Sequence, residues 1–156
     1  MDKHKFMLRA IELSAVGMQD GKGGPFGCVI VKDGKIVGEG YNQVTSTNDP
    51  TAHAEVVAIR NACKALNSFQ LEGCEIYTSC EPCPMCLGAI YWARPAKIYY
   101  ANTREDAENI GFDDSFIYDE IPLDIDKRKI PMIGINRTEA NAVFALWKTQ
   151  KNKIEY

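Results

Sequence analysis

The 156-residue sequence lacks several features that would mark other kinds of protein. No apolar run reaches the length of a membrane span, and the first residues carry charges inside the apolar pattern and no small-residue cleavage site, so we expect neither a membrane segment nor a signal peptide. The net charge of −3 argues against a general nucleic-acid binder, although not against a small RNA or nucleotide substrate. We therefore expect a cytoplasmic protein.

Histidine is scarce, with two residues, whereas cysteine is not, with six. In a cytoplasmic protein, cysteines are more typically thiols or metal ligands than disulfides. A chain of this length can bury a core large enough to fold without metal or disulfides. We expect a single domain over residues 1–156, without internal repeats or linkers.

Hydrophobic periodicity predicts alternating helices and strands. Apolar residues at helical spacing predict a helix over residues 3–19, and two apolar runs joined at Asp33-Gly34 predict a β-hairpin. The alternation implies a sheet with helices on both faces. Further expected elements are strands at 74–80, 97–102 and 129–135, helices at 103–110 and 142–151, and a loop at 111–120.

Two of the predicted helices carry most of the candidate chemistry. One runs from about His53 to residue 66, with Asp49 or Thr51 as its N-cap. The other opens at Pro82 and continues to about Trp92.

Three cysteines lie at equal spacing in the stretch TSCEPCPMC. Cys83 and Cys86 are three residues apart in the first turn of the second of these helices, so they share a face. Free backbone N–H groups and the helix dipole stabilise thiolates there, which is the form that zinc binds. Cys80 precedes the helix, and we interpret it as a half-buried neighbour of the site, with a Cys80–Cys83 pairing as the alternative.

His53 is the candidate third ligand, because His4 stands among lysines and is expected on the surface. Alone, a histidine at a helix start is more often a cap or a core residue, but the downstream CxxC reverses that expectation. No second CxxC completes a closed site, and three protein ligands with an open position are typical of catalytic zinc. The alternative from another class, a structural zinc domain, would need a fourth ligand such as Cys80.

Glu55 follows His53 by two residues, which a regular helix would place about 200° apart. Both can face one metal only if His53 lies in the first turn. Glu55 could then take a proton from a zinc-bound water, whose pKa falls to roughly 7, and hand it to a leaving group. The alternative is a first-turn acid that complements the helix dipole.

The segments HAE, at 53–55, and PCPMC, at 82–86, match the signature H-x-E…P-C-x-x-C of zinc-dependent nucleobase deaminases. The chain resembles this superfamily over nearly its whole length. The resemblance implies a cytidine-deaminase-like fold with three α/β/α layers around a mixed five-stranded sheet. It also implies a Zn²⁺ cofactor held by His53, Cys83 and Cys86, with Glu55 as a catalytic residue.

Within the superfamily, the chain most resembles the small bacterial guanine deaminases, on GGPFG, on residues 41–60, on residues 78–95 and above all on GFDDSFIYDE, at 111–120. The bacterial tRNA adenosine deaminases have a Gly-Ala-rich stretch in place of the last segment and more basic chains. The resemblance implies hydrolytic deamination of guanine, a small purine base, to xanthine and ammonia. Deamination of tRNA adenosine or of another base or nucleoside is the alternative.

Guanine offers N1–H and 2-amino donors, which suit a carboxylate, whereas adenine has an acceptor at N1. Asp113 and Asp114 both supply a carboxylate, and the resemblance points to Asp114 as the residue that holds the base and assists protonation; exposed loop acids are the alternative. By the same resemblance, Asn42 binds the base through its amide and Phe26 stacks on the ring. Trp92 either borders the pocket or fills core, and core packing is also the alternative for Phe26.

The C-terminal segment, about 138–156, is expected from the resemblance to pack over an active site. Tyr156 would then be a lid residue. Aromatic helix faces and the habit of the family suggest a homodimer, in which the covered site belongs to the partner.

Overall fold

The structure is a computed structural model and describes residues 2–156. The chain divides into two compact units, Met1–Asp114 and Ser115–Tyr156, which we call the N-terminal unit and the C-terminal unit. Across the described residues, none of the helices has both the length and the apolar content needed to cross a lipid bilayer.

The N-terminal unit is built on a mixed sheet in the order β2-β1-β3-β4. The strand β1 pairs antiparallel with both β2 and β3, whereas β3 and β4 run parallel. The predicted hairpin is confirmed: Asp33 and Gly34 join β1 to β2 with φ angles of 49° and 75°, as a two-residue type I′ turn requires. The strands are β1 (Gly27–Lys32), β2 (Lys35–Tyr41), β3 (Glu75–Cys80) and β4 (Lys97–Asn102).

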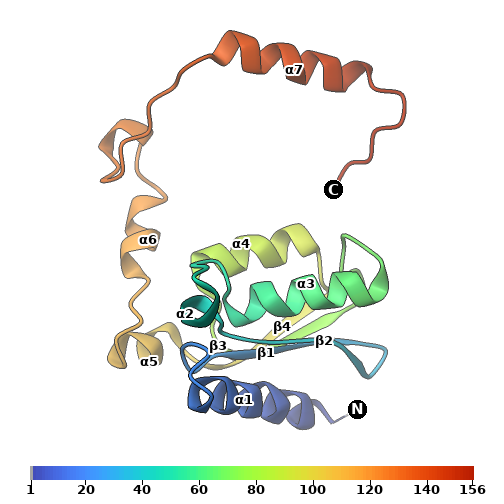
Figure 1. The fold of residues 1–156 in the computed structure, drawn as a ribbon, viewed down its shortest axis with the longest axis vertical. Coiled ribbons are helices and arrows are strands. Elements are labelled where there is room, and N and C mark those ends of the chain that lie inside the picture. The colour runs from blue at the N-terminus through green and yellow to red at the C-terminus, as the bar shows by residue number, and fades with distance from the viewer. Residues whose placement is uncertain (1) are drawn as a thin grey trace. The chain divides into compact units, whose positions relative to one another are not determined.

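Three layers form around this sheet. Helix α1 (Lys3–Gln19) lies on one face, and helices α3 (Ala54–Leu66) and α4 (Pro84–Ala93) lie on the other (Figure 1). Alternate residues of β1 pack on opposite faces of the sheet, because successive side chains of a strand point to opposite faces. Val29 and Val31 join the cluster with α1, whereas Cys28 and Ile30 join the cluster with α3. The predicted α/β/α layering is confirmed.

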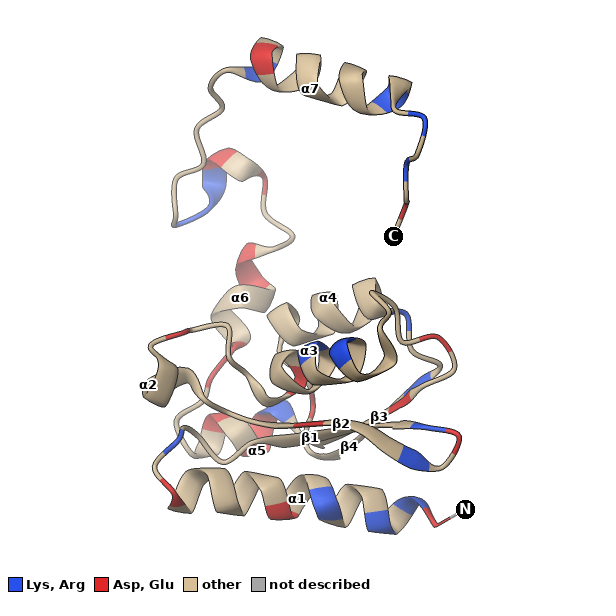
Figure 2. Ribbon diagram, turned by 45° about the vertical axis from the view of Figure 1, so that its right-hand side comes forward, with Lys and Arg blue, Asp and Glu red and all other residues tan. Residues whose placement is uncertain are grey.

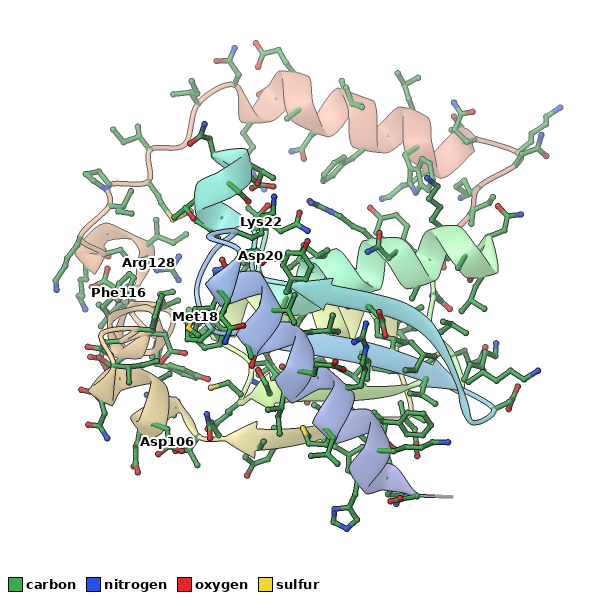
Figure 3. The ribbon with its side chains drawn as sticks, turned by 60° about the horizontal axis from the view of Figure 1, so that its bottom comes forward. Met18, Asp20, Lys22, Asp106, Phe116 and Arg128 are labelled. Carbon is green, nitrogen blue, oxygen red and sulfur yellow. The ribbon has the colours of Figure 1, made fainter. Side chains whose placement is uncertain are left out.

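Two shorter helices flank these layers. Helix α2 (Val44–Thr47) is a single turn in the loop after β2, where Lys22 supplies a backbone acceptor for the amide of Ser46 (Lys22 is labelled in Figure 3). Helix α5 (Arg104–Asn109) confirms the predicted short helix after β4. Acidic and basic residues are interspersed through the N-terminal unit, with acidic residues prominent in α5 (Figure 2).

The starts of α3 and α4 differ from the prediction. The N-cap of α3 is His53, not Asp49 or Thr51. The carboxylate of Asp49 is engaged inside the preceding loop, where it accepts from the amide N of Thr51 at 2.8 Å and from its hydroxyl at 2.7 Å. Helix α4 does not open at Pro82: its N-cap is Cys83 and its first residue is Pro84, a position that suits proline because its missing N–H is not needed there.

The C-terminal unit contains helices only: α6 (Ser115–Glu120), the short 3-10 helix η1 (Ile125–Lys127) and α7 (Arg137–Thr149). The stretch predicted as a loop, 111–120, thus includes a helix, and the last helix begins five residues earlier than expected.

The fifth strand predicted at residues 129–135 does not form, so the prediction of a five-stranded sheet was wrong, and the described residues form a sheet of four strands. A strand needs a neighbouring edge that pairs with its backbone N–H and C=O groups. In the described structure this segment pairs with no strand, and Ile133 and Ile135 are 83% and 78% exposed.

Candidate active site

Three metal-binding side chains converge at the starts of α3 and α4. His53 and Cys83 are the N-cap residues of the two helices, and Cys86 lies in the first turn of α4. Nδ1 of His53 lies 3.5 Å from Sγ of Cys83 and 3.5 Å from Sγ of Cys86. Tetrahedral zinc, with Zn–S of about 2.3 Å and Zn–N of about 2.05 Å, separates such donor atoms by about 3.6 Å. The donor set therefore fits zinc in type and spacing.

Protonation of the three donors is coupled. Hydrogen bonds from the Cys86 thiol and the His53 ring hold the pKa of Cys83 at about 4, so Cys83 is a thiolate at neutral pH. The same contact with Cys83, together with burial, raises the pKa of Cys86, and the Cys83 contact also raises the pKa of His53. A metal ion must displace the remaining proton of Cys86, because zinc binds thiolate.

Cys80 lies beside this cluster but is not part of it. Within residues 2–156, the group of side chains placed to hold a metal consists of His53, Cys83 and Cys86. The Sγ of Cys80 instead donates to the carbonyl of Thr103 at 3.5 Å, and burial raises the pKa of Cys80 to about 11. Because its sulfur atom is directed to this carbonyl and is not grouped with the other three donors, Cys80 is not placed as a metal ligand, which leaves three protein donors. All six cysteines are free.

Glu55 is buried next to the cluster. His53 has the extended backbone of an N-cap (φ −70°, ψ 156°), so the regular helix starts only after it, which is the condition for His53 and Glu55 to face one site. The Oε1 of Glu55 accepts from the hydroxyl of Thr78 at 2.8 Å, and its carboxyl group also contacts the thiol of Cys86. Burial raises the pKa of Glu55.

Thr78 supports Glu55 from the central strand β3. Its buried hydroxyl lies 2.8 Å from Oε1 of Glu55 and 3.0 Å from the carbonyl oxygen of Cys80. A hydroxyl has one proton, so it donates to one of these two acceptors at a time.

Asn42 and Phe26 lie next to each other at the end of the hairpin. The amide N of Asn42 donates to the carbonyl of Phe26 at 3.0 Å. The side-chain Oδ1 of Asn42 accepts from the amide N of Gly24 at 3.3 Å and of Val44 at 3.1 Å, so two backbone donors fix the side chain. A Cβ at Gly23 would lie 2.3 Å from this oxygen, so only glycine fits there.

The acidic segment after α5 brings Asp114 toward the cluster. Asp114 is less exposed than its neighbour Asp113. Burial raises the pKa of Asp114, the charge of Arg104 lowers it, and the charge of Cys83 raises it further. The influence of Cys83 places the carboxyl group within electrostatic range of the metal donors.

Two residues near this segment were missed by the sequence analysis. Phe112 packs edge-to-face against Phe26, with ring centroids 5.0 Å apart, and so ties the acidic segment to the candidate stacking residue. Arg104 lies against Asp114. Phe112 lies in the stretch GFDDSFIYDE, but the sequence did not indicate what it contacts. Arg104 was recognisable only as a single basic residue in a predicted helix that is otherwise acidic.

The remaining candidates are Trp92 and Tyr156. Trp92 is on α4 with 61% of its side chain exposed, which excludes the core-filling alternative. Tyr156 belongs to the C-terminal unit and is exposed there.

The described geometry is that of a zinc site with an adjacent buried acid. The family model of the cytidine and deoxycytidylate deaminase zinc-binding region matches residues 1–102, which contain the three metal donors and Glu55. The chain belongs to this family of zinc-dependent deaminases, and zinc is its cofactor.

Individual members of the family differ in how much of this chain they match. Guanine deaminase of Bacillus subtilis (strain 168) is 56% identical over 156 residues, all of both chains, and its X-ray structure matches with a TM-score of 0.97, covering 100% of this chain and 99% of that one. A guanine deaminase structure from Nitrosomonas europaea matches at 32% identity with a TM-score of 0.69, covering 72% of this chain and 65% of that one. The tRNA-specific adenosine deaminase of Aquifex aeolicus (strain VF5) is 41% identical over 101 residues, 65% of this chain and 66% of that protein.

Proposed function

We propose that this protein catalyses the hydrolytic deamination of guanine to xanthine and ammonia. The observation that carries the proposal is the partly buried carboxyl group of Asp114 near the metal donors, in a chain that is similar over its full length to a guanine deaminase. The similarity to that relative includes residues 103–156, which lie outside the range of the family model.

The chemistry divides between the metal site and Glu55. His53, Cys83 and Cys86 would hold the zinc ion, which would supply a bound water with a pKa lowered to roughly 7. Glu55 would accept one proton of this water as its oxygen bonds to C2 of guanine, and would deliver that proton to the ring nitrogen next to C2. Glu55 would then pass the proton of the new C2 hydroxyl to the 2-amino group, so that the C2–N bond breaks, ammonia leaves and the C2 carbonyl of xanthine forms. Its burial and raised pKa suit a group that holds a proton between two transfers.

The choice of base rests on groups around the ring. The carboxylate of Asp114 accepts from the N1–H and 2-amino donors of guanine, whereas the N1 acceptor of adenine would leave that carboxylate without a partner. Because the Oδ1 of Asn42 already accepts two backbone bonds, its Nδ2 is the group that donates to the base. Phe26, held by Phe112, stacks on the ring, and Trp92 borders the pocket.

The proposal extends to a cytoplasmic homodimer in which residues 138–156, with Tyr156 as a lid residue, pack over an active site. It is supported by the apolar side chains that α7 leaves exposed, among them Val143, Phe144 and Trp147. A second copy of the chain is the partner that we propose for them. Light scattering after gel filtration should give twice the mass of one chain, and a mass of one chain would contradict the dimer.

The direct test is ammonia release from guanine, adenine, cytosine and a tRNA substrate, each incubated with the zinc-loaded protein. We expect ammonia from guanine, and a Glu55→Gln variant that keeps its zinc but loses this turnover. Retained turnover in that variant would contradict the role of Glu55. Ammonia from tRNA but not from guanine would overturn the proposed substrate and favour the function of the Aquifex aeolicus relative.

A further inference from the structure

Arg104 and Asp114 form an ion pair at the edge of the candidate active site. The Nε of Arg104 lies 4.0 Å from Oδ1 of Asp114, and the two side chains are 39% and 19% exposed. Because the carboxyl group is mostly withdrawn from solvent, the charge of Arg104 acts on it with less screening than on the surface. Arg104 is thus a cation that faces the carboxylate proposed to recognise guanine.

The start of α5 is fixed to the chain that leads into the metal site. The backbone N–H of Arg104 donates to Oε2 of Glu81 at 3.0 Å, and the backbone N–H of Glu81 donates to the carbonyl of Asn102 at 2.8 Å. Glu81 lies two residues before the metal donor Cys83. The first turn of α5 is further closed by a capping box between Thr103 and Asp106, the latter labelled in Figure 3. Arg104 therefore projects from a rigid point beside the metal donors.

The helix alone gives no reason for a cation at this position. The start of a helix is the positive end of its dipole, where acidic residues such as Glu105 and Asp106 are favourable and an arginine is not. Asp114 supplies the compensating charge. Burial and the charge of Cys83 raise the pKa of Asp114, and Arg104 opposes both.

We propose that Arg104 is a positioning residue for guanine, which holds the carboxylate of Asp114 oriented toward the N1–H and 2-amino donors of the base. This inference rests on the proposed function. Arg104 acts through Asp114 and not on the reacting atoms. Its removal therefore weakens the binding of guanine more than it slows the chemical step.

The test compares Arg104→Ala with Arg104→Lys and with a matched control, Arg9→Ala. Arg9 is exposed to the same degree as Arg104 (37% against 39%). It lies on α1 and pairs at 2.8 Å with Glu39 on β2, whereas the metal donors lie at the starts of α3 and α4. We expect Arg104→Ala to raise KM for guanine about tenfold, as the loss of one charge-assisted contact would, with a smaller fall in kcat and with unchanged zinc content and melting temperature. Arg104→Lys keeps the charge and should recover most of the loss, whereas Arg9→Ala should leave KM unchanged.

A double-mutant cycle separates action through Asp114 from a general effect. In an Asp114→Asn background, Arg104→Ala should add no further rise in KM, because the group it positions is already gone. Additive effects, or an unchanged KM in Arg104→Ala, would overturn the inference.

Guanine binding to a Glu55→Gln variant, measured by calorimetry, keeps this inference apart from the proposed function. If that variant does not bind guanine and the unaltered protein does not deaminate it, the proposed function fails. If it binds guanine equally well with and without Arg104→Ala, only the role of Arg104 fails.

Discussion

The two units of the chain differ in where their apolar side chains lie. Within the described residues, every buried side chain lies between Phe6 and Ala93, in the N-terminal unit. The C-terminal unit buries none, and large apolar residues such as Ile130, Ile135, Phe144 and Leu146 are exposed. A segment that buries so little cannot offset the conformational entropy lost on ordering. We therefore expect the N-terminal unit to fold on its own core, and the C-terminal unit to depend on contacts outside itself.

The same division separates the candidate metal site from the proposed lid residue. The N-terminal unit supplies the three metal donors, Glu55 and Asp114. Of the metal donors, only Cys86 is buried with the core residues. Tyr156, the proposed lid residue, comes from the C-terminal unit. Changes in one unit should therefore alter turnover and stability, and changes in the other should alter association.

The largest effect is expected from Cys86→Ser in the N-terminal unit. The change removes a zinc donor, so bound zinc should be lost and guanine turnover should fall by roughly a thousandfold or more, on the scale of losing a main source of transition-state stabilisation. The circular dichroism spectrum should stay that of the folded protein. Zinc analysis and ammonia release measure the first two outcomes.

The control for Cys86→Ser is Cys63→Ser, a free thiol of α3 outside the metal cluster, which should keep zinc and activity. Unfolding of Cys86→Ser, or of the unaltered protein after chelation, would indicate a structural zinc domain and contradict the independence of the N-terminal core.

A smaller effect should distinguish the buried side chains of the N-terminal unit from the exposed apolar side chains of the C-terminal unit. Ile30→Ala removes a fully buried side chain between β1 and α3 and should lower the free energy of unfolding by about 2–5 kcal/mol. Phe144→Ala removes an exposed side chain and should change it by no more than about 0.5 kcal/mol in dilute protein.

Urea denaturation over a range of protein concentrations measures both variants. Any extra effect of Phe144→Ala should grow with concentration, because association stabilises by mass action. If Phe144→Ala in dilute solution lost as much free energy of unfolding as Ile30→Ala, the two units would not differ in the way that we expect.

The smallest expected effect is the pH dependence of the ion pair between Arg9 and Glu39, which joins α1 to the edge strand β2. The hydrogen bonds from Arg9 lower the pKa of Glu39 below its ordinary value. The folded state therefore gains stability above the pKa of an unfolded glutamate, about 4.3, and loses it as the pH falls through the lower folded pKa. The gain is at most about 1 kcal/mol for a pair this exposed.

Urea denaturation at pH 7 and at pH 3 measures this contribution. Arg9→Ala should be less stable than the unaltered protein at pH 7, and the difference should shrink at pH 3. A difference of equal size at both values would mean that Arg9 acts through packing and not through charge.

Much of the N-terminal unit was predictable because its apolar residues repeat at the period of each element. Phe6, Ala10, Leu13 and Gly17 share a helical stripe, and all four are buried in α1. The same rule misled at residues 129–135, where apolar residues occur at strand-like spacing but the segment pairs with no strand. Periodicity reports which side chains seek burial, but it does not report whether a partner strand is present.

The candidate site was predictable where its residues are close in sequence, as His53 and Glu55 or Cys83 and Cys86 are. The N-cap of α3 was not, because Asp49 has the chemistry of a cap but uses its carboxylate on Thr51. Arg104 and Phe112 were missed for a different reason. Their partners, Asp114 and Phe26, are brought close by tertiary structure and share no sequence period with them.

The hydroxyl of Thr78 offers the buried site a choice of two hydrogen-bonding patterns. When Glu55 is ionised, the hydroxyl can donate to it; when Glu55 carries a proton, the hydroxyl can turn to the carbonyl of Cys80 and accept from Glu55 instead. Among the described residues, no buried side-chain nitrogen or oxygen lacks a partner. The rotation of one O–H bond thus allows Glu55 to change its charge while it keeps its hydrogen bond with Thr78, and no heavy atom has to move.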